Sequence, residues 1–392
     1  HNSSDAGASR KAGGTMPARA GPQDFERIKM VGQGDVGKVF LVRLAGTKDI
    51  FAMKVLSKAE MIKRNKLKRC LTEREILATV DHPFIVTLYY CFQSNDHLFL
   101  VMDYCSGGEF YRMLKAQPEK RLPEEWVKFY CAEVLLALEY LHSCGFIYRD
   151  LKPENILLHQ SGHLMLTDFD LSKQARPITA PMVQQSFFSK LLGSDKDQPI
   201  NVLQIDTTSF VGTEEYIAPE VIQGTQQSSA VDWWTFGVLA YEMAFGFTPF
   251  RGNTQQATFS NICSHDKIRI PEKPATSQGF KKVVTLLLER QPAKRLGSRL
   301  GAADLKRSSF FADVKWADLP VSKPPFVPPE ENWDDPRHYL QTSASEDGDS
   351  TLDMCLRWAP EVRRLGSTPA APAAPAPAAP ATSSAANATL PA

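Results

Sequence analysis

Four residues in the middle of the chain carry oxygen ligands, a base and a cation at close spacing. Asp150, Lys152 and Asn155 fall within six positions, and Asp168 follows a segment that reads as a tight hairpin. Carboxylate and amide oxygens are the ligands that magnesium prefers, and a carboxylate is also a common general base. The spacing therefore predicts one site at which a metal ion, a proton acceptor and a positive charge meet.

A glycine-rich segment lies nearer the start of the chain, with Gly32, Gly34 and Gly37 followed by Val39. Glycines let backbone N–H groups come close enough to phosphates to bind them. The segment also fits dinucleotide-binding and phosphate-loop motifs, but both require a following helix, and the phosphate loop requires Ser or Thr where Val39 stands. A β-branched, strand-like segment follows here. We therefore expect a flap between two antiparallel strands that covers a nucleotide, with a plain structural turn as the alternative.

Lys54 lies in the middle of a predicted strand, with its side chain on the same face as Ala52. Glu73 lies one helix later, and an ion pair between the two would hold the lysine against the α and β phosphates of a nucleotide. Glu75 faces elsewhere because it is two positions further along the helix. The alternative is a lysine that only extends from the sheet edge into solvent.

The elements that must position these residues change in character along the chain. Residues 25–56 alternate in hydrophobicity as strands do, with Gly46 in a turn, and Leu98 to Met102 reads as a buried strand. One amphipathic helix is predicted over 61–80 from apolar residues at helical spacing: Leu67, Leu71, Leu77 and Val80. A longer helix is expected after Pro123 and up to Gly145. A small β-rich unit thus precedes a larger helical one, the plan of a two-lobed protein with a cleft between the lobes.

Bulk composition excludes some classes of function. The 392 residues are 43% hydrophobic, enough for a sizeable core, and the formal net charge of +1 does not indicate nucleic-acid binding. No run reaches the roughly 20 apolar residues of a membrane-spanning helix, although peripheral attachment to a membrane stays compatible with the sequence. Seven scattered cysteines without a CxxC pair predict reduced thiols and a cytoplasmic location.

The segment Tyr148 to Asn155 resembles the catalytic loop of protein kinases, and Asp168 stands where their metal-binding triplet begins. The resemblance continues through 218–220, 232–237 and Arg295, and it covers roughly three quarters of the chain. It implies an α+β, bilobal protein-kinase fold with a small β-rich N-lobe and a larger, mainly helical C-lobe. It also implies an ATP- and magnesium-dependent, non-specific serine/threonine protein kinase, because Lys152 in this loop is similar to that class.

The resemblance implies roles for individual residues. Asp150 would accept the proton of the substrate hydroxyl, Lys152 would neutralise charge on the transferred group, and Thr213 would hydrogen-bond Asp150. Asn155 and Asp168 would hold magnesium. Residues of the glycine-rich loop, the following strands, the first helix and the hinge would bind the nucleotide: Val31, Gly32, Gly34, Gly37, Val39, Ala52, Lys54, Glu73, Met102, Asp103, Cys105 and Glu109. Two structural groupings are also implied, namely an ion pair of Glu220 with Arg295 and an apolar stack of Leu77, Leu88, Tyr148 and Phe169.

Several details resemble the AGC group of protein kinases. Tyr148 replaces the usual His, and a tail carries Trp316 and the run Pro324 to Pro328. Within that group, the triplet Asp168-Phe169-Asp170 and the segment 209–217 look like the fungal flippase kinases and the plant phototropin-type kinases. The FxxF motif with which many relatives dock their tail onto the first lobe is absent, since no Phe follows Phe326. What holds the Glu73 helix in place is therefore open.

Regulation and substrate choice are further expectations from the resemblance. Ser209 occupies the position at which an upstream kinase would phosphorylate the activation loop, and a basic pocket would receive that phosphate: Arg69, Arg149 and Lys173. Four acids match positions that read basic residues before the target Ser or Thr: Glu109, Glu154, Glu215 and Glu242. The rival interpretations are a pseudokinase with the same fold and no chemistry, a metabolic kinase, and a nucleotide-binding oxidoreductase.

The expected domain organisation follows these patterns. Residues 1–22 are predicted to be disordered, 23–105 to form the N-lobe and 106–311 the C-lobe. A polar insertion at about 174–206 in the activation segment is either a disordered surface loop or a localisation or docking element. An AGC-type tail is expected at 312–342, followed by a disordered Ala/Pro-rich tail at 343–392.

Overall fold

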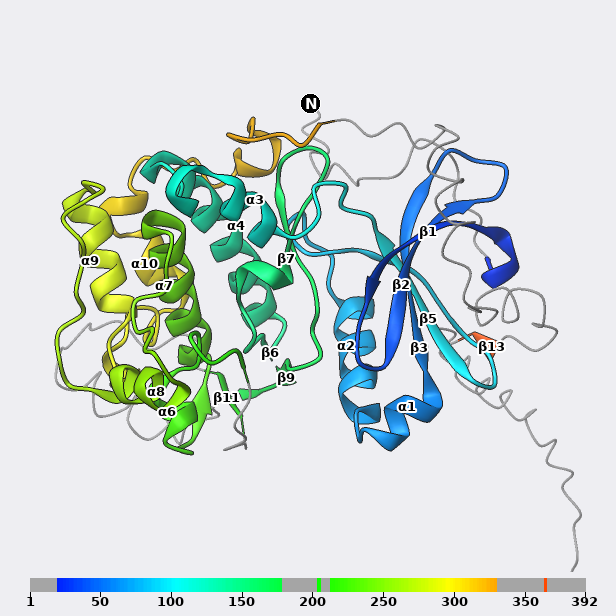
Figure 1. The fold of residues 1–392 in the computed structure, drawn as a ribbon, viewed down its shortest axis with the longest axis horizontal. Helices are drawn as coiled ribbons and strands as arrows, with labels where there is room; N and C mark the ends of the chain where they lie inside the picture. Colours follow the sequence, from blue (N-terminus) through cyan, green and yellow to red (C-terminus); the bar gives the residue numbers. More distant parts are fainter. Residues whose placement is uncertain (1–19, 178–202, 206–211, 330–362, 365–392) are drawn as a thin grey trace, which may run out of the picture.

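The computed structural model describes residues 20–177, 203–205, 212–329 and 363–364. Within these ranges the strands of the first sheet gather at one end and most helices at the other (Figure 1). The described residues thus have the predicted α+β organisation.

The larger sheet is antiparallel and has six strands in the spatial order β1-β2-β3-β5-β4-β13. Their bounds are β1 (Phe25–Gln33), β2 (Gly37–Leu44), β3 (Ile50–Ser57), β4 (Leu88–Gln93), β5 (His97–Asp103) and β13 (Arg363–Arg364). Gly46 has φ of 75° in the turn between β2 and β3, a conformation that glycine adopts without steric cost. One face of the sheet buries an aromatic cluster that includes Phe25, Phe51 and Phe92. Ala20 is buried against the same cluster, so packed structure begins before residue 23.

The other face of the sheet packs on α1 (Lys58–Lys63) and α2 (Leu67–Thr79). The prediction of one helix over 61–80 is therefore wrong, because the helix breaks at Asn65, whose φ is 53°. The predicted apolar stripe is also wrong at its start, since Leu67 and Leu71 are 45% and 46% exposed. The buried side of α2 includes Cys70, Glu73, Ile76 and Leu77. The carboxylate of Glu73 therefore faces inward, although the apolar periodicity of the sequence placed leucines on the buried side.

The helical lobe is built around two long helices, α4 (Glu124–Ser143) and α7 (Ala230–Phe245). Every residue of α7 is buried, as expected for a helix surrounded by others. Shorter helices complete this lobe: α3 (Phe110–Ala116), α6 (Pro219–Ile222), α8 (Gln255–Cys263), α9 (Gln278–Leu287) and α10 (Ala302–Lys306). Gly145, with φ of 81°, ends α4 as predicted. Single 3-10 turns lie at 22–24, 118–120, 153–155, 292–294, 309–311 and 319–321.

Three small sheets lie in the helical lobe or at its border. The predicted hairpin before Asp168 is formed by β7 (Ile156–Leu158) and β8 (Leu164–Leu166). A second pair joins β6 (Phe146–Ile147) to β9 (Lys173–Gln174). The third sheet has the order β10-β11-β12, from β10 (Arg176–Pro177), β11 (Leu203–Ile205) and β12 (Gln227–Ser228). It connects both ends of the activation-segment insertion to the start of α7.

The segment after the last helix packs back onto the molecule. Trp316 and Phe326 contact the main core, and Phe326 lies so close to the β7–β8 turn that a Cβ on Gly162 would be 2.2 Å from its carbonyl oxygen. Arg363 and Arg364 form β13, which pairs antiparallel with Gln93 and Phe92 of β4. These two residues lie inside the stretch for which no ordered structure was expected.

Among the described residues, no helix combines the length and apolar character needed to cross a membrane. The six described cysteines form no disulfide with one another.

Candidate active site

The glycine-rich loop is a hairpin between β1 and β2, as its sequence predicted. A Cβ on Gly37 would lie 2.0 Å from the Val55 carbonyl oxygen, so this glycine is required by the packing of β2 on β3. By contrast, a Cβ on Gly34 would meet nothing closer than 3.9 Å, and one on Gly32 nothing closer than 3.7 Å. Packing within the fold therefore does not require these two glycines, because a side chain would find room at either position.

Lys54 connects the sheet, the α2 helix and the segment after β8. Its Nζ atom donates to Oε1 of Glu73 at 2.6 Å and lies 3.8 Å from Oδ1 of Asp168. Although burial lowers it, the carboxylates of Glu73 and Asp168 together raise the pKa of Lys54 above its ordinary value. The lysine is therefore a permanent cation, held by one carboxylate and close to a second that can carry a metal.

The catalytic-loop residues converge on one carboxylate. Oδ2 of Asp150 accepts hydrogen bonds from Nζ of Lys152 at 3.0 Å and from Nδ2 of Asn155 at 2.7 Å. Burial raises the pKa of Asp150, while Lys152 and Asn155 lower it. Nδ2 of Asn155 also donates to the Asp150 carbonyl oxygen, so the amide oxygen of Asn155 is the atom left to ligate a metal.

The donor set suits magnesium. The Asn155 amide oxygen and the Asp168 carboxylate are hard ligands, and Asp168 is held at φ of 57°, a strained conformation that directs its side chain. Within the described residues there is no cluster of three His, Cys, Asp or Glu side chains that would enclose a metal by itself. Magnesium usually takes one or two protein ligands and completes its shell with phosphate and water, so the Asn155 amide oxygen and the Asp168 carboxylate are enough protein ligands for it.

Asp232 of α7 fixes the backbone of the catalytic loop through hydrogen bonds. Its carboxylate accepts from the backbone N–H groups of Tyr148 and Arg149 at 2.9 and 2.7 Å, and it lies 2.7 Å from Nε2 of His142. These bonds fix Arg149 at φ of 68° immediately before Asp150. From the sequence, Asp232 was named only as the start of the segment 232–237 that resembles protein kinases, with no role of its own. A carboxylate inside the very apolar run of α7 was the signal that it binds something buried.

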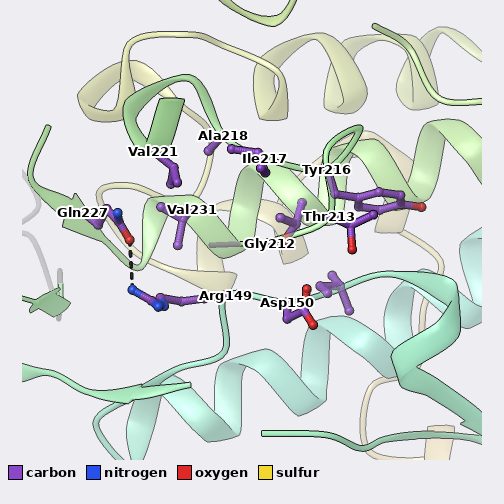
Figure 2. A pocket seen from close by; sticks show the side chains of 12 residues that line it. Arg149, Asp150, Gly212, Thr213, Tyr216, Ile217, Ala218, Val221, Gln227 and Val231 are labelled. Atoms are coloured by element: carbon purple, nitrogen blue, oxygen red, sulfur yellow. Dashed lines mark hydrogen bonds between the residues drawn. The ribbon is translucent and has the colours of Figure 1, made fainter. Parts of the chain in front are cut away.

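Thr213 lies in the same small cavity as Asp150 but does not bond it. Figure 2 shows both side chains among the residues that line this cavity, together with Arg149 and Gln227. The expected hydrogen bond between Thr213 and Asp150 is not formed among the described residues, where the side-chain donors to Asp150 are Lys152 and Asn155.

The predicted hinge residues Met102 and Asp103 end β5, and Cys105 follows just after it. Met102 and Cys105 are buried, and the Asp103 carboxylate accepts from the Thr87 backbone N–H and the Tyr89 hydroxyl, both at 2.8 Å. The side chain of Asp103 thus fixes the chain as it leaves the sheet. The backbone of this segment remains the part of the hinge suited to contact a nucleotide base.

Residues 25–311 match the family model of the protein kinase domain. The chain belongs to the protein kinase family, within its AGC-type serine/threonine kinases.

Three curated relatives illustrate this similarity. The chain is 56% identical over 308 residues to Flippase kinase 1 of Saccharomyces cerevisiae, and the aligned region covers 79% of this chain and 34% of that protein. It is 52% identical over 341 residues to Serine/threonine-protein kinase nrc-2 of Neurospora crassa, covering 84% of this chain and 54% of that protein. It is 48% identical over 307 residues to Phototropin-1A of Oryza sativa, and the aligned region covers 78% of this chain and 33% of that protein. The chain thus spans less than two thirds of the length of these relatives.

This kinase domain also forms the apolar stack that was expected between the lobes. Phe169 and Tyr148 are fully buried, with ring centroids 5.3 Å apart in an edge-to-face arrangement. Leu77 of α2 is buried in the same core, and Leu88, the fourth expected member, is half-buried against it. The hydroxyl of Tyr148 donates to the Thr167 carbonyl oxygen at 2.5 Å, immediately before Asp168. The stack therefore ties the position of Asp168 to that of the catalytic loop.

Two charged clusters of the kinase domain flank the site. Burial lowers the pKa of Lys173, and so do Arg149, Lys68 and Arg69, which indicates that these cations lie near one another. On the other side, burial raises the pKa of Glu154, and the charges of Glu242 and Glu109 raise it further. Glu215 belongs to the same region, since with Glu154 it raises the pKa of Tyr216, whose hydroxyl donates to Glu242.

Proposed function

We propose that the protein transfers the γ-phosphoryl group of ATP to serine or threonine hydroxyls of protein substrates. The observation that carries this proposal is the convergence of three groups: the Lys54–Glu73 pair, the Asp168 carboxylate 3.8 Å from Lys54, and the Asp150–Lys152–Asn155 cluster. Each is a separate requirement of phosphoryl transfer to an alcohol.

In this mechanism the chain mainly positions groups and balances charge. Lys54 binds the α and β phosphates, and backbone N–H groups near Gly32 and Gly34 cover the nucleotide. Asn155 and Asp168 would hold magnesium, which neutralises charge on the phosphate oxygens. Asp150 orients the substrate hydroxyl and takes its proton as the new P–O bond forms. The bond between the γ-phosphorus and the β–γ bridging oxygen breaks in the same transfer, so ADP leaves, while Lys152 stabilises charge on the transferred group.

The test is transfer of labelled phosphate from ATP to a serine peptide by the purified protein. Asp150→Asn should lower kcat by about 10²–10⁴ with ATP affinity retained, because a general base typically contributes that much. Asp313→Asn, at an exposed ion pair with Lys128, is the matched control. A pseudokinase would bind ATP and transfer no phosphate above the level of Asp150→Asn, and that result would reject the proposal.

Phosphorylation of Ser209 by an upstream kinase is proposed as the activating event. Ser209 lies outside the described residues, but the cations Arg69, Arg149 and Lys173 support an anion site beside the catalytic loop. A phosphoserine with roughly −1.5 to −2 charges would relieve the repulsion among them. Ser209→Ala should therefore lower activity, and unchanged activity would reject this part.

Selection of substrates with basic residues before the target is supported by the acidic cluster of Glu109, Glu154, Glu215 and Glu242. Three members already have cationic partners: Lys115 lies 3.0 Å from Glu242, Arg251 lies 3.5 Å from Glu215 and Arg112 lies 3.7 Å from Glu109. Glu154 has no ion-pair partner among the described residues and is the member best suited to receive an arginine. Preference for acidic residues on a peptide array would overturn the assignment.

A cytoplasmic location is proposed from the free cysteines, with peripheral membrane attachment compatible with it. The name of the yeast relative connects that protein to a flippase, and a flippase is the first candidate substrate proposed for this chain. A phosphoproteomic comparison of cells with the intact protein and with Asp168→Ala would test it. The candidate fails if no flippase site changes.

A further inference from the structure

Gln227 is a fully buried polar side chain that contacts the catalytic loop. It lies in β12, and its Oε1 atom accepts a hydrogen bond from Nη1 of Arg149 at 3.2 Å (Figure 2). The guanidinium of Arg149 also donates from Nε to the Leu171 carbonyl oxygen at 2.9 Å. Arg149 immediately precedes Asp150, so whatever holds its side chain also bears on the placement of the general base.

Arg149 needs such an acceptor. Burial lowers its pKa to about 10, and although Asp232 and Asp150 act in the opposite direction, Arg69 lowers it further. Asp232 is bonded to the backbone N–H of Arg149, whereas the guanidinium donates to the two neutral oxygens of Leu171 and Gln227. A buried cation without adequate acceptors is costly. Removing Oε1 of Gln227 would therefore favour movement of Arg149 toward solvent.

The position of Gln227 depends on the insertion in the activation segment. Ile205 of β11 pairs with Gln227, and Leu203 accepts a hydrogen bond from the Ser229 backbone N–H at 2.9 Å. The side chains of Leu203 and Ile205 are buried in the main core, and β10 pairs with β11 on the other side. The two ends of the insertion are thus part of the C-lobe, and β11 pairs with the strand whose Gln227 contacts Arg149.

We propose that Gln227 is a positioning residue for phosphoryl transfer that acts through Arg149, and that β10 and β11 at the base of the insertion hold it in place. The inference rests on the proposed kinase activity and adds to it a second input to the catalytic loop. Gln227 supplies a neutral acceptor, and a phosphate on Ser209 would supply an anion to the same basic cluster. A carboxylate at position 227 should then partly replace that phosphate.

Three substitutions test the side chain, in the full chain and in the Ser209→Ala background. Gln227→Leu should lower kcat about 10-fold or more while KM for ATP stays within about twofold, because one acceptor of a buried cation is lost. Gln227→Glu should raise kcat in the Ser209→Ala background. Gln226→Leu, at the exposed neighbouring glutamine, is the matched control and should change neither. The inference is overturned if Gln227→Leu matches Gln226→Leu, or if Gln227→Glu lowers kcat as much as Gln227→Leu at equal melting temperature.

A readout independent of activity separates this inference from the proposed function. The Nη1–H protons of Arg149, which donate to Gln227 and are assigned by NMR with Arg149→Lys, should exchange slowly with water in the intact protein and in Gln226→Leu, and quickly in Gln227→Leu. Equal exchange in all three overturns the positioning role even if the protein proves to be an active kinase. If exchange at Arg149 becomes fast only in Gln227→Leu, the positioning role is supported even if no substrate is phosphorylated.

Two replacements test the role of the base strands. Exchange of residues 178–202 for a short Gly/Ser linker retains β10 and β11 and should leave kcat on a generic peptide unchanged. Exchange of 176–205 removes both strands and should reproduce the effect of Gln227→Leu on kcat and on exchange at Arg149. If both replacements behave alike in both measurements, the strands do not position Gln227.

Discussion

Arg295 donates from Nη1 and Nη2 to the two carboxylate oxygens of Glu220, at 2.7 and 2.9 Å, with both side chains almost fully buried. Arg295 also donates to the carbonyl oxygens of Ala230 at 2.6 Å and Glu289 at 2.9 Å. The pair therefore joins α6, the start of α7 and the segment after α9. It is a structural connection beneath the activation segment, as the resemblance to kinases implied.

Breaking this pair should destabilise the C-lobe. Arg295→Leu would leave the Glu220 carboxylate buried and unpaired, and loss of one partner of a buried pair typically costs about 3–5 kcal/mol. Denaturant unfolding monitored by tryptophan fluorescence measures the free energy of unfolding. Arg299→Leu, at an exposed arginine four positions away, is the control. Equal unfolding midpoints for the two variants would contradict a stabilising role.

The ion pair at Lys54 predicts different effects for two glutamates on one helix. Glu73→Gln should reduce kcat/KM for ATP by about 10- to 100-fold, because a charged hydrogen bond that orients Lys54 is lost. Glu75→Gln should have little effect, since Glu75 is exposed on the opposite side of α2. Steady-state kinetics with varied ATP measures both. A similar loss in both variants would indicate that the helix as a whole was damaged.

The pH dependence of activity should reflect Asp150. Since burial raises its pKa, Asp150 becomes ionised only above the pH at which an ordinary aspartate does, so the acid limb of kcat/KM should lie above that of a solvent-exposed carboxyl. Lys152 lowers the pKa of Asp150, so Lys152→Met should move the acid limb to still higher pH. The profile of kcat/KM against pH measures the shift, with Lys128→Met as the control. An acid limb that stays in place or moves down argues against Asp150 as the base.

Glu154 should be important only for substrates with arginine before the target residue. Glu154→Gln should reduce kcat/KM for such a peptide by about 10- to 100-fold, because a charge-assisted hydrogen bond is lost. The same variant should differ little from the intact protein on a peptide in which glutamine replaces the arginines. Glu125→Gln, an exposed glutamate at the start of α4, is the control. An equal loss on both peptides would assign Glu154 to catalysis or folding instead of selection.

Local chemistry was readable from the sequence where residues close in the chain act together. Asp150, Lys152 and Asn155 lie within six positions, so one turn of chain suffices to bring them together, and the hairpin that carries Asp168 next to them has its own turn signal. The glycine-rich loop was likewise predictable as a hairpin, because strand-like residues flank it. The orientation of α2 was not predictable from periodicity, since Leu67 and Leu71 face outward and Glu73 faces inward toward Lys54.

By itself the sequence determined the two-lobed fold and the chemical groups of the site, because hydrophobic patterning and short-range spacing are local properties. Only the tertiary structure decided which distant residues support that site. The attachment of Asp232 to the catalytic loop, the burial of Gln227 against Arg149 and the pairing of β11 with β12 each join segments separated by tens of residues. Such contacts form through packing of the whole lobe, so a local pattern can mark a residue such as Asp232 but does not identify its partner.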